Sequence, residues 1–202
     1  MKTTVDTLQY EKNFLEQGYA LIAGIDEAGR GPLAGPVTCA CCMPDLQKII
    51  AGVDDSKKMS AKKREELFLS LRESTDRYAI IDVDKDIIDE INILNATKKG
   101  MSEAFFVLSP RPEVVLIDAV RLDLPSEVLP IIHGDALSYC IAAASILAKV
   151  HRDHLMDEYA ALYPEYGFDQ HKGYGTKYHI EMLKKYGPCP IHRKTFIKNF
   201  FK

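Results

Sequence analysis

The chain has 202 residues, of which 47% are hydrophobic and 27% are charged, and its formal net charge is −3. This composition is typical of a globular domain and excludes a disordered or fibrous chain. The longest apolar run, residues 140–148, is too short to cross a bilayer, and the N-terminus lacks the apolar segment of a secretory signal. We therefore expect one domain over residues 1–202 and no membrane partner.

Sequence patterns predict alternating helices and strands along the chain. The first half contains a short helix at 9–17, strands at 19–25 and 37–43, a helix at 60–74 capped by Ser60, a strand at 77–83 and a helix at 92–108. The second half contains strands at 113–118 and 129–133, a long helix at 136–162, a loop at 163–175 and a helix at 177–186. A hairpin followed by strand–helix units predicts an α/β domain with a mixed sheet.

The cysteines and the C-terminal charge distribution are both informative. Cys39, Cys41 and Cys42 share one apolar stretch, and the five cysteines fit neither a disulfide framework nor paired zinc knuckles. We interpret them as reduced, buried side chains of a cytoplasmic protein.

Residues 166–202 hold eight Lys or Arg against two acidic residues, with aromatic residues interleaved. This extension, from about residue 163, suits a polyanionic partner, although a solvated surface helix and tail have the same composition.

Three predicted strands run into an aspartate: Asp26 in LIAGID, Asp118 in EVVLID and Asp135 in PIIHGD, with Glu27 directly after Asp26. Single acidic residues are common after strands, but three strand ends together are a stronger signal. Ligands of open α/β sheets gather beyond the carboxyl ends of strands. Crowded carboxylates repel one another, and a hard cation such as Mg²⁺ or Mn²⁺ relieves that repulsion. Two such ions promote phosphodiester hydrolysis.

Two other patterns are weaker. Residues 29–34 match a dinucleotide-binding fingerprint formally, but Pro32 and Gly35 prevent the helix that such a site requires. His151 and His154, one helical turn apart, have the spacing of zinc ligands, although a solvated helix face explains them better.

A set of stretches carries a specific resemblance. In chain order they are GIDEAGRGPLAGPV (24–37), DSKKMS (55–60), INILNAT (91–97), VLID (115–118), GDA…IAAASILAKVHRD (134–153), YPEYGF (163–168) and HKGYGT (171–176). Together they resemble ribonuclease HII over nearly the whole chain. The resemblance implies a ribonuclease H-like fold, a mixed central sheet flanked by helices with a C-terminal helical extension.

The resemblance also implies an activity. Ribonuclease HII cleaves the RNA strand of RNA–DNA hybrids and cuts 5′ of ribonucleotides embedded in duplex DNA. Its catalytic, metal-binding carboxylates match Asp26, Glu27, Asp118 and Asp135. Hydrolysis with two divalent ions, Mg²⁺ or Mn²⁺, is expected to leave a 3′-hydroxyl and a 5′-phosphate.

The same resemblance assigns substrate contacts. Gly29, Arg30 and Gly31 match a motif whose backbone contacts the ribose 2′-hydroxyl, and Tyr174 matches a residue that packs on the following deoxyribose. Candidate phosphate contacts are Lys57, Lys58, Lys149, Arg152 and Lys172, for each of which a solvated side chain is an equal alternative.

The chain departs from the family pattern at two positions. His133 stands where a lysine is common, and His151 where a threonine is common. If His133 contacts phosphate, substrate affinity depends on pH, because histidine titrates near neutrality. Neither change alters a metal ligand.

One expectation concerns the first carboxylate pair. Adjacent residues of a strand face opposite sides, so Asp26 and Glu27 share a site only if the chain bends or Glu27 reaches round. We expect the glycines and prolines after them to supply the bend.

Other interpretations remain open from the sequence. Ribonuclease HIII carries an extra N-terminal domain, whereas only about twenty residues precede the first strand here, which favours HII. A ribonuclease H-like DNA nuclease of the resolvase or transposase type would need no 2′-hydroxyl sensor. A non-catalytic nucleic-acid-binding module would gain nothing from four carboxylates.

Ile197, Phe200 and Phe201 faintly resemble a sliding-clamp-binding tail, but Lys194 replaces its glutamine. We expect a monomer.

Overall fold

The computed structural model describes residues 6–201 and centres on one mixed sheet. Its strands are β1 (Ile22–Ala28), β2 (Val37–Cys42), β3 (Tyr78–Val83), β4 (Val114–Asp118) and β5 (Glu127–Ile131), in the order β3-β2-β1-β4-β5. β1, β2 and β3 are antiparallel neighbours, whereas β4 is parallel to both β1 and β5. The mixed α/β fold is confirmed.

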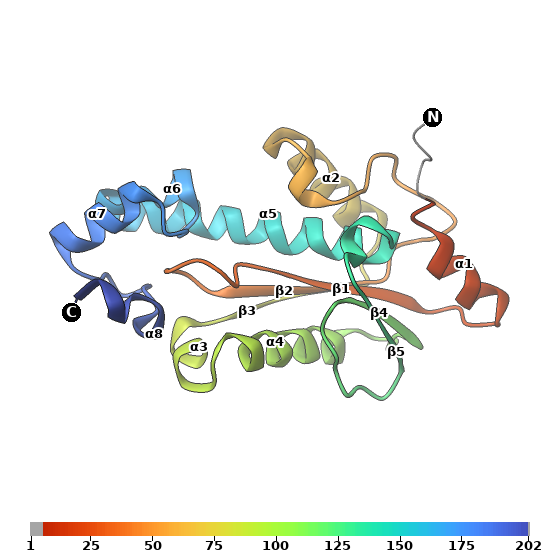
Figure 1. The fold of residues 1–202 in the computed structure, drawn as a ribbon. Helices are drawn as coiled ribbons and strands as arrows, with labels where there is room; N and C mark the ends of the chain where they lie inside the picture. The colour runs from red at the N-terminus through yellow and green to blue at the C-terminus, as the bar shows by residue number, and fades with distance from the viewer. Residues whose placement is uncertain (1–5, 202) are drawn as a thin grey trace.

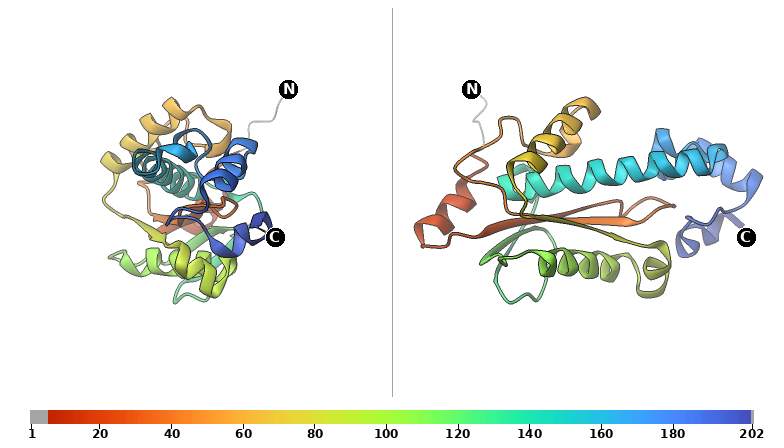
Figure 2. Two further views of the ribbon diagram at one scale, coloured as in Figure 1. Left: turned by 90° about the vertical axis from the view of Figure 1, so that its left-hand side faces the viewer. Right: turned by 180° about the vertical axis from the view of Figure 1, so that it is seen from behind.

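Helices cover both faces of the sheet (Figures 1 and 2). They are α1 (Gln9–Glu16), α2 (Ala61–Ser74), α3 (Lys85–Ile91), α4 (Ile93–Val107), α5 (Tyr139–Leu162), α6 (Phe168–His171), α7 (Lys177–Tyr186) and α8 (Lys194–Ile197). Short 3₁₀ turns occupy Ser56–Lys58, Gly134–Ala136, Pro164–Tyr166 and Lys198–Phe201. α2 and α5 lie on one face, α3 and α4 on the other, and α6 to α8 lie beyond one end of the sheet (Figure 1).

The long helix α5 lies directly on β1. A Cβ atom at Gly24 would stand 2.0 Å from the carbonyl carbon of Cys140, a backbone atom that cannot move aside. Only glycine permits this approach. The apolar first half of α5 is buried from Tyr139 to Ala148, as its sequence predicts. The contact fixes the height of α5 above the end of β1, where the predicted carboxylates lie.

Several boundaries differ from the sequence expectation. β1 continues through Asp26 and Glu27, which pair in regular register with Ala40 and Cys39 of β2, so the expected bend between the two carboxylates is wrong. The helix α3 was not predicted. α5 begins at Tyr139, because Ser138 accepts a hydrogen bond from the Ile141 amide at 3.2 Å as its cap.

Most of the cysteines are buried, as the sequence predicts. No disulfide forms among residues 6–201, and four of the five cysteines are buried, while Cys189 is half-buried. Within the same residues, no helix is long and apolar enough to cross a membrane.

Three histidines form a cluster in the C-terminal extension. His171 and His179 stack with ring centroids 4.5 Å apart, and His179 Nε2 lies 3.0 Å from His192 Nε2. His179 Nδ1 donates to the Tyr174 carbonyl at 2.9 Å, and His192 Nδ1 accepts from the Cys189 amide at 3.0 Å. This network needs an unprotonated nitrogen on each ring. Burial lowers the pKa of both His179 and His192 to about 4.

The cluster predicts acid lability of the extension. A histidine whose pKa is depressed in the folded state contributes stability that is fully present above its unfolded pKa, roughly 6.5, and is lost as the pH falls toward 4. We expect the thermal midpoint of the wild type to fall across this window, and His179→Gln to flatten that dependence. Thermal unfolding followed by circular dichroism measures both. An equal pH slope in wild type and variant would contradict the assignment.

Candidate active site

A cleft of about 220 Å³ lies at the carboxyl end of β1. Its lining comprises Asp26, Glu27, Ala28, Gly29, Arg30, Gly31, Ser56, Lys57, Asp118, Ser145, Lys149, Arg152 and Tyr174. The structure thus brings together most of the residues that the sequence singled out. A larger groove of about 850 Å³ runs beside the start of β1 and contains none of them.

Two of the carboxylate positions follow from strand pairing. β1 and β4 run in parallel with Ile25 opposite Ile117, so Asp26 and Asp118 come next on the two adjacent strands, Asp118 as the last residue of β4. Asp118 accepts a hydrogen bond from the Gly134 amide at 2.9 Å, which ties the turn carrying Asp135 to the end of β4. The carboxylates therefore come from three separate parts of the chain.

Asp135 reaches the site by a different route from the one expected. β5 ends at Ile131, and Asp135 lies beyond it in a 3₁₀ turn that follows the left-handed His133, whose φ is 57°. Asp135 is 5% exposed, and its Oδ2 accepts a hydrogen bond from Lys57 Nζ at 2.9 Å. Since Lys57 lines the cleft, this ion pair joins Asp135 to it.

The surroundings of the Asp26 and Glu27 carboxyl groups disfavour their charged forms. Burial raises the pKa of Asp26, and the adjacent Glu27 carboxylate raises it further. Burial also raises the pKa of Glu27, although the Arg30 guanidinium, 3.2 Å from Glu27 Oε1, opposes that rise. The other oxygen, Glu27 Oε2, is buried and has no hydrogen-bond partner among the described residues. Such an orphaned carboxylate oxygen requires an explanation.

The donor set fits a hard divalent cation. Its members are carboxylate oxygens, the ligands that Mg²⁺ and Mn²⁺ prefer, and one of them is the unpartnered Glu27 Oε2. As they stand, no three acidic, His or Cys side chains within residues 6–201 form a closed ligand cage. Two oxygens already have partners, because Lys57 holds Asp135 and the Gly134 amide holds Asp118. Each of these carboxylates keeps lone pairs that could bind a cation while its hydrogen bond is retained.

The glycine-arginine-glycine turn forms the wall of the cleft next to the carboxylates. Gly29 has a φ of 92°, and a Cβ there would fall 2.0 Å from Arg152 Nε. A Cβ at Gly31 would lie 3.5 Å from Tyr174 Cε1, so the tyrosine ring stands beside this glycine. The predicted Gly29–Gly31 motif and Tyr174 are therefore neighbours.

Arg152 lines the cleft but bonds mainly to backbone groups. It is 1% exposed, and its guanidinium donates to the carbonyls of Ala34, Pro36 and Lys172 at 3.0 to 3.2 Å. These bonds favour a structural role over the predicted phosphate contact, which stays a prediction. Arg152 supports the turn between β1 and β2.

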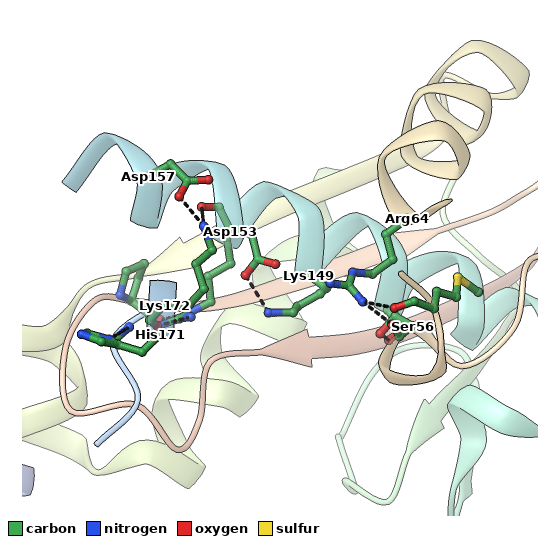
Figure 3. A network of polar contacts seen from close by, with 12 residues as sticks. Ser56, Arg64, Lys149, Asp153, Asp157, His171 and Lys172 are labelled. Carbon is green, nitrogen blue, oxygen red and sulfur yellow. Dashed lines mark hydrogen bonds and ion pairs between the residues drawn. The ribbon is translucent and has the colours of Figure 1, made fainter. Parts of the chain in front are cut away.

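The predicted lysines divide into two groups. Lys57 and Lys149 line the cleft, and Lys149 Nζ also donates to Asp153 Oδ1 at 2.6 Å. Lys172 pairs with Asp157 and lies outside the cleft lining. The two ion pairs Lys149–Asp153 and Lys172–Asp157 follow one another along α5 (Figure 3). Lys58 pairs with Asp55 at 3.3 Å and also lies outside the lining.

Sequence reasoning missed several residues around the cleft. Ser56 and Ser145 line it with their hydroxyl oxygens 2.8 Å apart, and the only local signal was a serine within the apolar run of α5. His151 pairs with Asp82, its Nε2 lying 2.7 Å from Asp82 Oδ2, and within residues 6–201 it belongs to no group of three His, Cys, Asp or Glu side chains that could hold a metal ion. Arg193 is completely buried and donates to the carbonyls of the turn.

Comparisons with known proteins agree with this geometry. The family model for ribonuclease HII matches residues 23–202. The chain belongs to the ribonuclease HII family. The ribonuclease HII of Ruminiclostridium cellulolyticum is 54% identical over 96% of this chain and 76% of its own length. That of Caldicellulosiruptor saccharolyticus is 49% identical over 100% of both chains. As a ribonuclease HII, the protein is an endonuclease that degrades the RNA strand of RNA–DNA hybrids.

Solved structures show the same fold. The ribonuclease H2 of Pyrococcus horikoshii is 29% identical with a TM-score of 0.76, covering 91% of this chain and 100% of its own. The ribonuclease HII of Archaeoglobus fulgidus, solved in complex with PCNA, is 26% identical with a TM-score of 0.75, covering 90% and 97%. Of the functions left open by the sequence, the DNA nuclease and the non-catalytic module are therefore set aside.

The buried charge of Glu27 predicts a gain in stability when it is removed. In this ribonuclease HII, Glu27→Gln is expected to raise the free energy of unfolding at neutral pH by on the order of 1 kcal/mol without divalent cations, because a neutral amide is easier to bury. Urea unfolding measures the change, with Glu90→Gln, at an exposed position, as the matched control. A lower midpoint for Glu27→Gln than for the control would contradict this account.

Proposed function

We propose that the cleft at the end of β1 is the active site of this ribonuclease HII. Asp26, Glu27, Asp118 and Asp135 would hold two divalent cations, Mg²⁺ or Mn²⁺. The enzyme would cut within RNA–DNA hybrids and on the 5′ side of ribonucleotides embedded in duplex DNA. The observation that carries the proposal is that Asp26, Glu27 and Asp118 line one cleft and that Glu27 Oε2 is buried there without a hydrogen-bond partner among the described residues.

The chain's own groups prepare the site for hydrolysis. The Gly134 amide orients Asp118, and Lys57 orients Asp135. Ser145 faces Asp26, and its hydroxyl opposes part of the rise in the pKa of that carboxyl. When bound, the cations supply an activated water and neutralise charge on the departing 3′ oxygen. The products are a 3′-hydroxyl and a 5′-phosphate.

Substrate choice is assigned to the wall of the cleft beside the carboxylates. The backbone of Gly29, Arg30 and Gly31 would contact the ribose 2′-hydroxyl, the group that distinguishes RNA from DNA. Tyr174, which is 46% exposed beside Gly31, would pack against the next sugar. Because Gly29 follows Glu27 so closely in the chain, the proposed sugar contact would lie next to the reacting phosphate.

The cations around the cleft are assigned to the nucleic-acid backbone. Lys57 and Lys149 would contact phosphates near the cut, and Lys58 and Lys172 would contact phosphates further along the duplex. The exposed His133, on the turn before Asp135, is a further candidate in place of the family's usual lysine.

A sliding-clamp contact through the C-terminal tail is a secondary part of the proposal. The relative from Archaeoglobus fulgidus was solved with PCNA. In this chain Ile197 is 3% exposed, and Phe196 packs against the core under the Arg193 guanidinium, 5.1 Å from its ring centroid. Of the three residues that resemble a clamp-binding segment, Ile197 is thus buried in the domain, whereas Phe200 is half-buried and Phe201 is 49% exposed.

The proposal is tested with a labelled DNA duplex that contains one internal ribonucleotide. With Mg²⁺ or Mn²⁺, the wild type is expected to cut 5′ of the ribonucleotide and to leave the all-DNA duplex intact. Asp118→Asn should reduce the cleavage rate by more than roughly 100-fold, because ligand loss exceeds the loss of an outer-shell partner. Asp123→Asn, at an exposed position, is the control. Equal cutting of the all-DNA duplex, or substantial turnover by Asp118→Asn, would refute the assignment.

A further inference from the structure

Arg193 is a buried cation without an acidic partner. The residue has no exposed surface, and its guanidinium forms no ion pair with an acidic side chain of the described part of the chain. Burial, and after it the neighbouring Arg152, lowers the pKa of Arg193 to about 9, so the group is still charged at neutral pH. A buried charge is costly unless it is fully hydrogen-bonded. Its partners therefore indicate what the residue is for.

All four side-chain hydrogen bonds of Arg193 go to one turn. Its guanidinium donates to the carbonyls of Gly29 at 2.6 Å, Arg30 at 2.9 Å, Gly35 at 2.9 Å and Pro36 at 3.0 Å. Backbone bonds reinforce the contact, because the Arg193 amide donates to the Leu33 carbonyl at 2.9 Å. A single side chain of the C-terminal extension thus holds both ends of the turn between β1 and β2.

These bonds determine which way two peptide groups face. In a planar trans peptide the C=O and N–H bonds point in opposite directions. The carbonyls of Gly29 and Arg30 point at the buried guanidinium, so the amides of Arg30 and Gly31 point away from it. Neither amide has a hydrogen-bond acceptor among residues 6–201, and both residues line the cleft. The two amides are available to an oxygen in the cleft.

We infer that Arg193 is the positioning residue for ribose recognition, holding the Arg30 and Gly31 amides toward the substrate sugar. The inference rests on the proposed function, in which this turn contacts the 2′-hydroxyl. Arg193 does not touch the substrate. Without its four bonds the two peptides are free to rotate, and a specific donor to the 2′-hydroxyl is lost while phosphate contacts are kept.

Loss of Arg193 is expected to weaken the preference for a ribonucleotide without weakening the general affinity for a duplex. Loss of a hydrogen bond of this kind costs roughly 1 kcal/mol or more, which corresponds to about a fivefold to tenfold change in an equilibrium constant. An all-DNA duplex makes the same phosphate contacts but has no 2′-hydroxyl at the cleft. Its affinity should therefore be insensitive to Arg193.

The test measures KM and kcat of the metal-loaded enzyme for the single-ribonucleotide duplex, and the inhibition constant of an all-DNA duplex of the same sequence. For Arg193→Gln we expect kcat/KM to fall by about fivefold to tenfold while the inhibition constant stays within about twofold. Arg193→Lys keeps the charge but offers a single ammonium in place of the planar fork, so it should show the same selective loss. If Arg193→Gln does not fold, the same measurements on Arg193→Lys test the inference.

The control is Leu183→Ala, which removes a fully buried side chain of α7 and loosens the extension without removing a donor to the turn. An equal loss of selectivity in Leu183→Ala would overturn the inference, as would folded Arg193 variants with wild-type selectivity. A wild type that binds both duplexes equally would instead refute the proposed 2′-hydroxyl recognition itself. Circular dichroism and thermal unfolding establish that each variant is folded.

Discussion

Buried negative charge at the end of β1 is the constraint around which the cleft is arranged. Asp26 is 4% exposed and Glu27 is its direct neighbour in an unbroken strand, so two carboxylates are withdrawn from water side by side. Nearby positive groups offset this only in part, through Arg30 on Glu27 and Lys57 on Asp135. The close contact of α5 at Gly24 keeps the site at the end of a rigid strand. Rigid elements hold ligands more accurately than loops do.

The proposed metal ligands Asp26 and Glu27 and the proposed sugar-contacting turn Gly29–Gly31 are close in sequence, but different parts of the chain support them. The carboxylates depend on the sheet and on the turn before α5. The glycine-arginine-glycine turn depends on two buried arginines, Arg152 from α5 and Arg193 from the C-terminal extension. On this account the extension contributes to selectivity from beneath the turn, and its basic composition is only part of its contribution to nucleic-acid binding.

Local patterns predicted most of the fold and part of the site. The Ser60 cap and the bounds of α7 at 177 and 186 were predictable because capping and periodicity are local. Asp26 and Asp118 were found because parallel strand ends meet. The roles of Arg152 and Arg193 could not be predicted, since their acceptors lie more than a hundred residues away for most bonds and a buried arginine has no local signature. The expected bend failed because β2 pairs with β1 through both carboxylates.

The central claim is that these carboxylates together form a divalent-cation site. Calorimetric titration of Mn²⁺ into the nucleic-acid-free enzyme tests it most directly, comparing the wild type with Asp26→Asn and with the exposed Asp123→Asn. The account predicts binding to the wild type and to Asp123→Asn, and an affinity at least roughly tenfold weaker for Asp26→Asn. Unchanged Mn²⁺ affinity in a folded Asp26→Asn variant would contradict it.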